Sequence, residues 1–491
     1  MKKTVSIALL LTLLLPLIVS CGEGTDQTNA PDKPASPVVV SDAAGPGEEA
    51  PAEPETEAAA ENPILEDGLG DLDLGGYDFR ILSCFYNDLD TWRYLLCDEL
   101  TGIPLNDQLY ETKLYLEDRF NIHFSMIEPG NDEVSMNAFM ASVTSGDDAF
   151  DMHVGKNWRT CQLGTKGYCY NMYEIDEFDF EKPWWPKETV NQLTIGKKMF
   201  AASNYASYCG IHWTRVMVAN KDLLAARQME VPYETVREGK WTLDELYTMT
   251  NGMSEDTNGD GTIGEGDVVA LLGYDQAYYC LQESAECSVY RRDEEHIPYL
   301  DLDVDRISGY VDKMRKLMTG SDYRQGSTAE FANNTAVFAF CEIRDAYNIY
   351  RGSDVRYGFL PPPKYDEAQD RYISCCTDTV WALPRTLPAS RESSTGTILE
   401  ALSCHNYNYM LPVYLESTLK SRLADNPDDA EMLQIIVDSR TIAFAFAMKL
   451  TYDNFIKDVV FNNQEVASYL QKSAKLAQKT LEGVVEGYIG D

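Results

Sequence analysis

The chain has 491 residues, with 79 acidic side chains against 41 basic ones and a formal net charge of −38. This acidity argues against nucleic-acid binding, which needs a basic face, and no apolar run after residue 20 is long enough to span a membrane. The length allows about three domains of ordinary size. Only five histidines are present, and none has the spacing of a zinc-binding helix, so the sequence does not indicate a zinc hydrolase.

The N-terminus has the pattern of a bacterial lipoprotein signal. Two lysines precede an apolar stretch over residues 7–19, and Cys21 follows where that stretch ends. We expect residues 1–20 to be a signal peptide and Cys21 to become the lipid-modified first residue, although an ordinary signal peptide with an incidental cysteine fits the same stretch. The lipid would anchor the protein to the cell membrane on its extracytoplasmic side, at the cell surface or in the periplasm.

The next segment is acidic and lacks aromatic residues. Residues 22–70 carry twelve acidic residues against one lysine. Such a segment cannot bury enough apolar surface to offset its chain entropy. We therefore expect residues 21–75 to be the lipidated cysteine and a disordered acidic tether, with the folded part starting at residue 76.

Eleven cysteines remain after Cys21, and an odd number cannot pair completely. Cys161 and Cys169, like Cys280 and Cys287, are close enough in sequence for local bridges. A chain of this size does not need such bridges for stability, so buried free thiols are the preferred interpretation. No CxxC motif is present, so neither a redox site nor a metal knuckle is indicated.

The first half of the folded part alternates strand and helix patterns. A β-type run at residues 79–84 precedes an apolar helix face over 109–120, a strand pattern at 122–127, a helix at 136–143 and a short strand at 150–154. This order predicts a mostly parallel sheet with helices on both faces. Ligands of such sheets bind beyond the carboxyl ends of the strands.

A second α/β unit begins near residue 216. Thr242 can cap a helix that starts within residues 241–246, and Glu245 can reach back to its first turn. Further patterns predict a helix at 307–318, strands at 337–340, 357–360 and 380–383, and helices around 432–436 and 466–481.

The sharpest motif is the acidic loop at residues 256–267. Its oxygen-bearing side chains stand at positions 1, 3 and 5 of an EF-hand-type loop, with a glycine at the sharp turn and a backbone carbonyl at position 7. Position 12 is Asp where the usual motif has Glu. The spacing predicts a structural Ca²⁺ site, with a polar turn without metal as the alternative. The predicted ligands are Asp256, Asn258, Asp260, Thr262 and Asp267.

Four short segments carry a family resemblance. Residues 218–223 resemble a "YNKD" segment, residues 241–246 a "WT.DEL" helix, residues 331–338 an "F..GKAAM" segment with Asn-Thr in place of Gly-Lys, and residues 357–363 a "G..P.P" strand. In this order they resemble the bacterial extracellular solute-binding lipoproteins of family 1, the sugar-binding type that serves ABC importers. The resemblance covers residues 76–491 together with the signal.

The resemblance implies a fold as well as a function. The fold is α/β, two-lobed and periplasmic-binding-protein-like (type II), with a hinge between the lobes. Lobe 1 would comprise residues 76–210 plus 376–425, and lobe 2 residues 211–375 plus 426–491. The protein would be a non-enzymatic monomer that closes on a solute, expected to be a mono- or oligosaccharide, and delivers it to ABC permease subunits.

Candidate site residues follow from the chemistry of sugar binding, which uses aromatic faces together with carboxylates, amides and arginines. Core packing is the alternative for each aromatic candidate, and a mutual ion pair is the alternative for the Glu/Arg pair. The candidates at strand ends and crossovers are Tyr86, Asn87, Trp92, Asn157, Trp158, Tyr208, Trp213, Glu342, Arg344 and Asp378. Trp184 and Trp185 are expected to pack a loop between the lobes.

Two other functions remain open. A calcium-containing surface adhesion or scaffold protein would bind a protein partner instead of a small solute. A secreted glycosidase would need two carboxylates across a cleft, which 79 acidic side chains allow. However, the sequence has no serine nucleophile elbow, Walker loop or zinc signature.

Overall fold

The computed structural model describes residues 63–86, 89–274, 278–377, 379–419, 426–452 and 455–490. The pattern of contacts along the chain divides it into two units, residues 1–62 and residues 63–491. The predicted signal peptide, Cys21 and most of the predicted tether therefore lie outside the described residues. No helix in the described parts is both long and apolar enough to cross a membrane.

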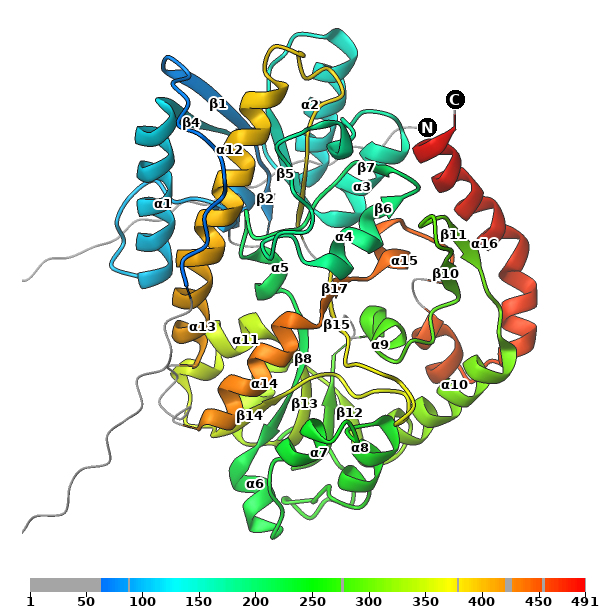
Figure 1. Cartoon of the computed structure of the whole chain (residues 1–491). Helices are drawn as coiled ribbons and strands as arrows, with labels where there is room; N and C mark the ends of the chain where they lie inside the picture. The colour runs from blue at the N-terminus through cyan, green and yellow to red at the C-terminus, as the bar shows by residue number, and fades with distance from the viewer. Residues whose placement is uncertain are drawn as a thin grey trace, which may run out of the picture. The chain divides into compact units, whose positions relative to one another are not determined.

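The sheet of lobe 1 has the strand order β16-β5-β1-β4, and Figure 1 labels β4, β1 and β5 of this sheet. β1 (Tyr77–Leu82) runs parallel to β4 (Ile122–Ile127) and to β5 (Met152–Gly155), whereas β16 (Val380–Ala382) is antiparallel to β5. The prediction of a mostly parallel sheet is confirmed here. The register pairs Tyr77 with Ile122, so β1 and β4 match along their whole lengths.

Helices follow each parallel strand of lobe 1. α1 (Pro104–Phe120) packs on β4, and α2 (Asp132–Ser145) and α3 (Asn157–Thr165) pack on β5. α1 begins with proline in its first turn, buries an apolar stripe that includes Leu109, and ends at Asn121 in the left-handed region. A later helix, α12 (Glu392–His405), packs against α1.

The sheet of lobe 2 has the order β12-β9-β13-β8-β14. β12 (Tyr323–Gln325) and β13 (Ala336–Glu342) are parallel to β9 (Val269–Gly273), while β8 (Arg215–Asn220) is antiparallel to β13 and to β14 (Tyr357–Leu360). Lobe 2 is therefore mixed, because the chain enters it along β8 in the direction opposite to β13. β9 was not predicted, since all of its residues are buried and show no alternation.

The helices of lobe 2 include α8, whose predicted cap is present. The Thr242 hydroxyl accepts the backbone N–H of Glu245 at 3.3 Å. The helices that follow strands or loops of this lobe include α6 (Lys221–Ala226), α7 (Tyr233–Arg237), α8 (Leu243–Thr250), α10 (Val304–Met318) and α11 (Ile343–Asn348).

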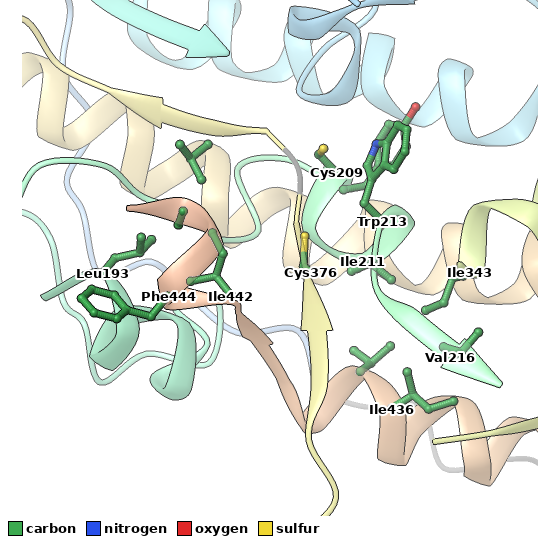
Figure 2. Packing of buried hydrophobic residues seen from close by; sticks show 14 of the residues in the cluster. Leu193, Cys209, Ile211, Trp213, Val216, Ile343, Cys376, Ile436, Ile442 and Phe444 are labelled. Atoms are coloured by element: carbon green, nitrogen blue, oxygen red, sulfur yellow. The ribbon is translucent and has the colours of Figure 1, made fainter. Parts of the chain in front are cut away.

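Three chain segments cross between the two sheets side by side. β15 (Ser374–Cys376) pairs in parallel with β17 (Arg440–Ile442), and Thr214 forms an antiparallel bridge with Cys376. Figure 1 shows β15 and β17 between the two larger sheets. Figure 2 shows apolar side chains of these segments, among them Ile211, Cys376 and Ile442, packed together in the buried core.

The C-terminal part belongs to both lobes. α14 (Pro427–Asp438) packs on β14 of lobe 2, whereas α15 (Phe444–Ala447) contacts α3 of lobe 1. α16 (Val466–Ile489) contacts α3 and also α10 of lobe 2. The assignment of all of residues 426–491 to lobe 2 therefore does not hold for α15 and α16, because the long apolar stripe of α16 covers both lobes.

Residues 63–75 lie along lobe 1 instead of belonging to a disordered tether. The carboxylate of Asp67 pairs with Arg119 of α1 at 2.5 Å, and the backbone N–H of Leu65 donates to Asn408 at 3.0 Å. Leu65, Leu69 and Leu74 are partly buried against the core. The predicted boundary at residue 75 is corrected to residue 63, because these leucines give the acidic segment apolar contacts.

All eleven described cysteines are buried and none of them forms a disulfide in the described parts of the chain, so the interpretation of buried thiols without bridges is confirmed. The remaining elements are short and connect the lobes or their loops. They are β2 (Phe85–Tyr86), β3 (Leu89–Asp90), η1 (Thr91–Tyr94), η2 (Met172–Glu174), α4 (Lys187–Leu193), β6 (Thr194–Ile195), β7 (Lys198–Met199), α5 (Cys209–His212), α9 (Tyr278–Ser284), β10 (Tyr290–Arg292), β11 (Pro298–Leu300), η4 (Thr328–Asn333), η5 (Tyr350–Gly352), η6 (Asn406–Met410), α13 (Leu411–Leu419) and η7 (Lys457–Phe461).

Candidate functional site

The loop after β1 of lobe 1 meets the strand ends of lobe 2 beside the first crossover. In lobe 2, Tyr274 follows β9 and Arg344 follows β13. Trp213 precedes β8, which is antiparallel to β13, so it lies at the same edge of the sheet. In lobe 1, Tyr94 lies in η1, and its hydroxyl accepts the indole N–H of Trp213 at 3.4 Å. This bond joins the loop after β1 to the first crossover.

Buried aromatic rings form the centre of this region. Tyr208 and Trp213 were predicted, and both are buried. The ring of Tyr94 packs edge-on against Tyr208 with centroids 5.2 Å apart, and His212 packs against Tyr208 at 5.4 Å. Core packing, the alternative that the sequence left open, therefore describes most of the surface of these rings.

A buried carboxylate organises the charged groups at the end of β13. Glu342 is 1% exposed, and one of its oxygens pairs with Arg215 and accepts the Tyr274 hydroxyl at 3.1 Å. Its other oxygen accepts Nε–H of Arg344. Glu342 is thus surrounded by protein donors, which is the ion pair that the sequence left open as an alternative.

Arg344 and Arg215 differ in how exposed they are and in how many of their N–H groups have partners. Arg215 is 3% exposed and also donates to the carbonyl of Trp213 at 2.8 Å and to Thr377 at 2.5 Å. The guanidinium of Arg344 stacks on the ring of Trp213, 3.9 Å from its centroid, and its side chain is 33% exposed. Within the described parts of the chain, its Nη groups donate to no other residue.

His212 links this cluster to α11 and α13. Its Nδ1 lies 2.9 Å from the hydroxyl of Tyr414, whose ring stacks on Tyr347 at an interplanar angle of 4°. Burial and, to a smaller extent, the nearby charge of Arg344 together lower the pKa of His212 to about 3. The imidazole is therefore neutral at physiological pH.

The sequence did not single out several members of this cluster. They come from separate elements, so only the fold brings them together, although Arg215 at the start of a fully buried strand was a detectable signal. The members missed are Tyr94, His212, Arg215, Tyr274, Tyr347 and Tyr414.

Three other candidates lie beside strands of lobe 1. Trp92 is buried in η1, with the guanidinium of Arg93 4.7 Å from its ring. Asn157 follows β5 and is buried, and its Nδ2 has no hydrogen-bond partner among the residues that the structure describes. Trp158 is partly exposed and has Arg159 at 4.4 Å and Lys449 at 5.0 Å from its ring. No ring contact joins these side chains to Trp213 within the described residues.

The last three candidates remain predictions. Tyr86 ends the short strand β2. Asn87 and Asp378 lie outside the described residues.

Trp184 and Trp185 were expected to pack a loop between the lobes, but both pack within lobe 1 instead. Their indole N–H groups donate to the two carboxylate oxygens of Glu400 at 2.7 and 2.8 Å. Glu400 lies on α12 of lobe 1 and is 1% exposed. Burial raises the pKa of Glu400 to about 7, although the two indoles act in the opposite direction.

In the predicted calcium loop, backbone N–H groups bond to the acidic side chains. Asp256 accepts from Gly259 and Gly261, both at 2.7 Å, and Asp267 accepts from Thr257 at 3.0 Å. Gly261 has φ of +86°, as the sharp turn requires. Among the described residues, no three His, Cys, Asp or Glu side chains are grouped as metal ligands.

Solved structures match the chain, whereas no family model matches it and a search of curated proteins finds no match. A cyclo/maltodextrin-binding protein complexed with maltotetraose has a TM-score of 0.53 at 13% identity, over 86% of this chain and 97% of that chain. UgpB from Mycobacterium tuberculosis, in complex with glycerophosphocholine, has a TM-score of 0.52 at 15% identity, over 83% and 98%. A sugar transporter protein from Rhizobium etli in an open conformation has a TM-score of 0.50 at 10% identity, over 84% and 99%.

At sequence identities this low, a structural match shows a shared fold and nothing about function. The matches cover nearly the whole length of each solved chain, so both lobes and the crossovers are included. The two sheets, the side-by-side crossovers and these structural matches all indicate the same fold. The chain has the two-lobed α/β fold of the periplasmic-binding-protein-like solute-binding proteins.

Proposed function

We propose that this protein captures an extracellular carbohydrate between its two lobes and delivers it to an ABC importer. The observation that carries the proposal is that the loop after β1 of lobe 1 meets the strand ends of lobe 2 at a cluster of aromatic rings and arginines beside the first crossover. Such sites suit sugars, whose apolar faces stack on rings and whose hydroxyls bond to charged groups. Neighbours of the same fold were solved with maltotetraose and with glycerophosphocholine.

Closure of the lobes would follow from contacts to both sides. A solute that contacts Tyr94 of lobe 1 and Arg344 of lobe 2 gains its full set of contacts only when the lobes are close together. It therefore shifts the population toward the closed form by its difference in affinity for the two forms. A permease that recognises the closed form would receive loaded protein, and no bond is made or broken in this cycle.

A thermal-unfolding screen against mono- and oligosaccharides tests this proposal on residues 22–491. A saccharide at a hundred times its dissociation constant adds about 2.7 kcal/mol to the free energy of unfolding and raises the melting temperature by a few degrees. If no saccharide in the panel raises the melting temperature of a protein that unfolds cooperatively, the result would count against carbohydrate capture. Turnover of an oligosaccharide, seen by product analysis, would support the glycosidase alternative instead.

The proposed anchor is a lipid on Cys21, which would hold the protein at the cell membrane. Expression of the full chain with a labelled fatty acid should label the wild type and not the Cys21→Ser variant. Equal labelling of both would contradict the anchor. Unlabelled wild-type protein released into the medium would contradict it as well.

We also propose that the loop at residues 256–267 binds a structural Ca²⁺. Its support is the spacing of oxygen groups in the sequence and the turn at Gly261, and a carboxylate that accepts an N–H group keeps further lone pairs for a cation. A chelator should lower the melting temperature of the wild type, and Ca²⁺ should restore it. Asp260→Asn should be far less sensitive, whereas Asp301→Asn, an acidic position outside the loop, should behave as the wild type. No response of the wild type to the chelator would contradict the proposal.

A further inference from the structure

The free edge of Arg344 points to the chemistry of the solute. Its Nε–H is bonded to Glu342 and its Cζ lies over the ring of Trp213, so two separate contacts hold the guanidinium in place. Its two Nη groups donate to no residue within the described parts of the chain, and the side chain is one-third exposed. A fixed guanidinium with a free pair of parallel N–H groups matches a carboxylate or phosphate oxyanion.

The two described carboxylates that act on Arg344, those of Glu342 and Asp345, already accept hydrogen bonds from other groups. Glu342 is almost fully buried and is shared with Arg215, so two guanidinium groups face one carboxylate. Asp345 is 3% exposed and accepts the backbone N–H of Glu342 at 3.0 Å, which turns it into lobe 2. Neither acid can close off the exposed edge of Arg344.

The position of Arg344 places this edge where a solute would lie. It lies in the first turn of α11, two residues after β13 ends, and parallel strands bring their carboxyl ends to the ligand side of such sheets. Its ring partner Trp213 contacts Tyr94 of lobe 1. An anionic group held there would be within reach of both lobes.

We propose that Arg344 binds an oxyanion of the solute, so that the captured carbohydrate is an acidic sugar that carries a carboxylate or a phosphate. This inference rests on the proposed function and narrows its substrate class. Glu342 and Trp213 act as positioning residues, since they hold the guanidinium and do not themselves meet the anion.

Calorimetric titration with matched ligands tests the inference. The probes are D-glucuronate and glucose 6-phosphate against D-glucose, and trigalacturonate against maltotriose. The wild type should bind at least one acidic probe at least tenfold more tightly than its neutral match, and the identity of that probe separates the carboxylate from the phosphate. Binding of neutral probes alone would overturn the inference and leave the proposed function standing. Binding of no probe by folded protein would count against both.

Variants separate the role of Arg344 from a general loss of structure. Arg344→Gln should weaken the acidic probe about 10- to 100-fold and the neutral probe less than about threefold, because a charged hydrogen bond is lost. Arg344→Lys keeps the positive charge but lacks the paired N–H groups, so its affinity for the acidic probe should lie between those of the wild type and Arg344→Gln. Arg351→Gln removes a guanidinium that also stacks on an aromatic ring, Tyr347 at 4.8 Å, and should change neither affinity. An equal loss for acidic and neutral probes in Arg344→Gln would contradict the assignment.

Discussion

Two buried carboxylates that lie beside tryptophans behave differently in this protein. Glu400 in lobe 1 accepts two neutral indole N–H groups, from Trp184 and Trp185, and every donor in the arrangement is used. Glu342 at the crossover is bonded to two guanidinium groups, and the Nη groups of one of them, Arg344, donate to no residue in the described parts of the chain. The first arrangement is complete in itself and stabilises lobe 1. The arrangement at Glu342 instead holds the guanidinium of Arg344 in a position to bind a solute.

The largest expected difference between the two sites is in stability. Glu342→Gln leaves Arg215 buried without its counter-charge, which should lower the free energy of unfolding by about 3–5 kcal/mol. Glu400→Gln keeps an acceptor for one indole and loses the other bond, so it should cost about 1–3 kcal/mol. Urea unfolding at pH 7 measures both. Equal losses would mean that charge does not distinguish the two carboxylates.

The next difference is in the response to pH. Burial raises the pKa of Glu400 from 4.5 to about 7, so the folded protein binds this proton more tightly than the unfolded chain does. The stabilisation is therefore complete below about pH 4.5 and is lost as the pH rises through 7. Between pH 5 and 8 the loss should be about 2–3 kcal/mol, at about 1.4 kcal/mol for each pKa unit.

Glu400→Gln is the control for this pH effect. Glu283 and Asp345, whose pKa values burial raises to about 7 and about 6, titrate in both proteins, so the difference between wild type and variant isolates Glu400. Unfolding free energies measured at pH 5 and pH 8 should fall more steeply in the wild type. Parallel pH profiles would show that Glu400 is ionised in the folded protein at both pH values.

The smallest expected effect is that of Arg344 on stability. Its side chain is one-third exposed, and Glu342 keeps Arg215 when Arg344 is removed. Arg344→Gln should therefore lower the free energy of unfolding by less than about 1 kcal/mol, in contrast to Glu342→Gln. Urea unfolding of the two variants side by side makes the test. A loss as large as that of Glu342→Gln would make Arg344 a structural residue.

Local patterns predicted most of the elements. β4 and β14 were predicted at their observed bounds, and the cap of α8 by Thr242 was read from its spacing. These features depend on neighbours in the sequence, so periodicity and capping rules identify them. β9 escaped the same rules, because a strand that is buried on both faces has no alternating pattern.

The site was harder to predict, because its contacts join distant parts of the chain. Tyr208, Trp213, Glu342 and Arg344 were identified from residue type and position near crossovers. Which of them stay accessible depends on tertiary contacts, and sequence alone could not show that Glu342 is enclosed by two arginines while Arg344 keeps a free edge. The same limit applies to Trp184 and Trp185, whose partner Glu400 is more than 200 residues away in the sequence.

Tryptophan fluorescence during titration tests the central claim, that a carbohydrate binds at the crossover. The chain has seven tryptophans, and the account predicts that Trp213 reports binding while Trp184 does not. With glucuronate, trigalacturonate and maltotriose as probes, Trp213→Phe should lose most of the ligand-induced change, and Trp184→Phe should retain it. A full change in Trp213→Phe that is lost in Trp184→Phe would place the ligand elsewhere and contradict the account.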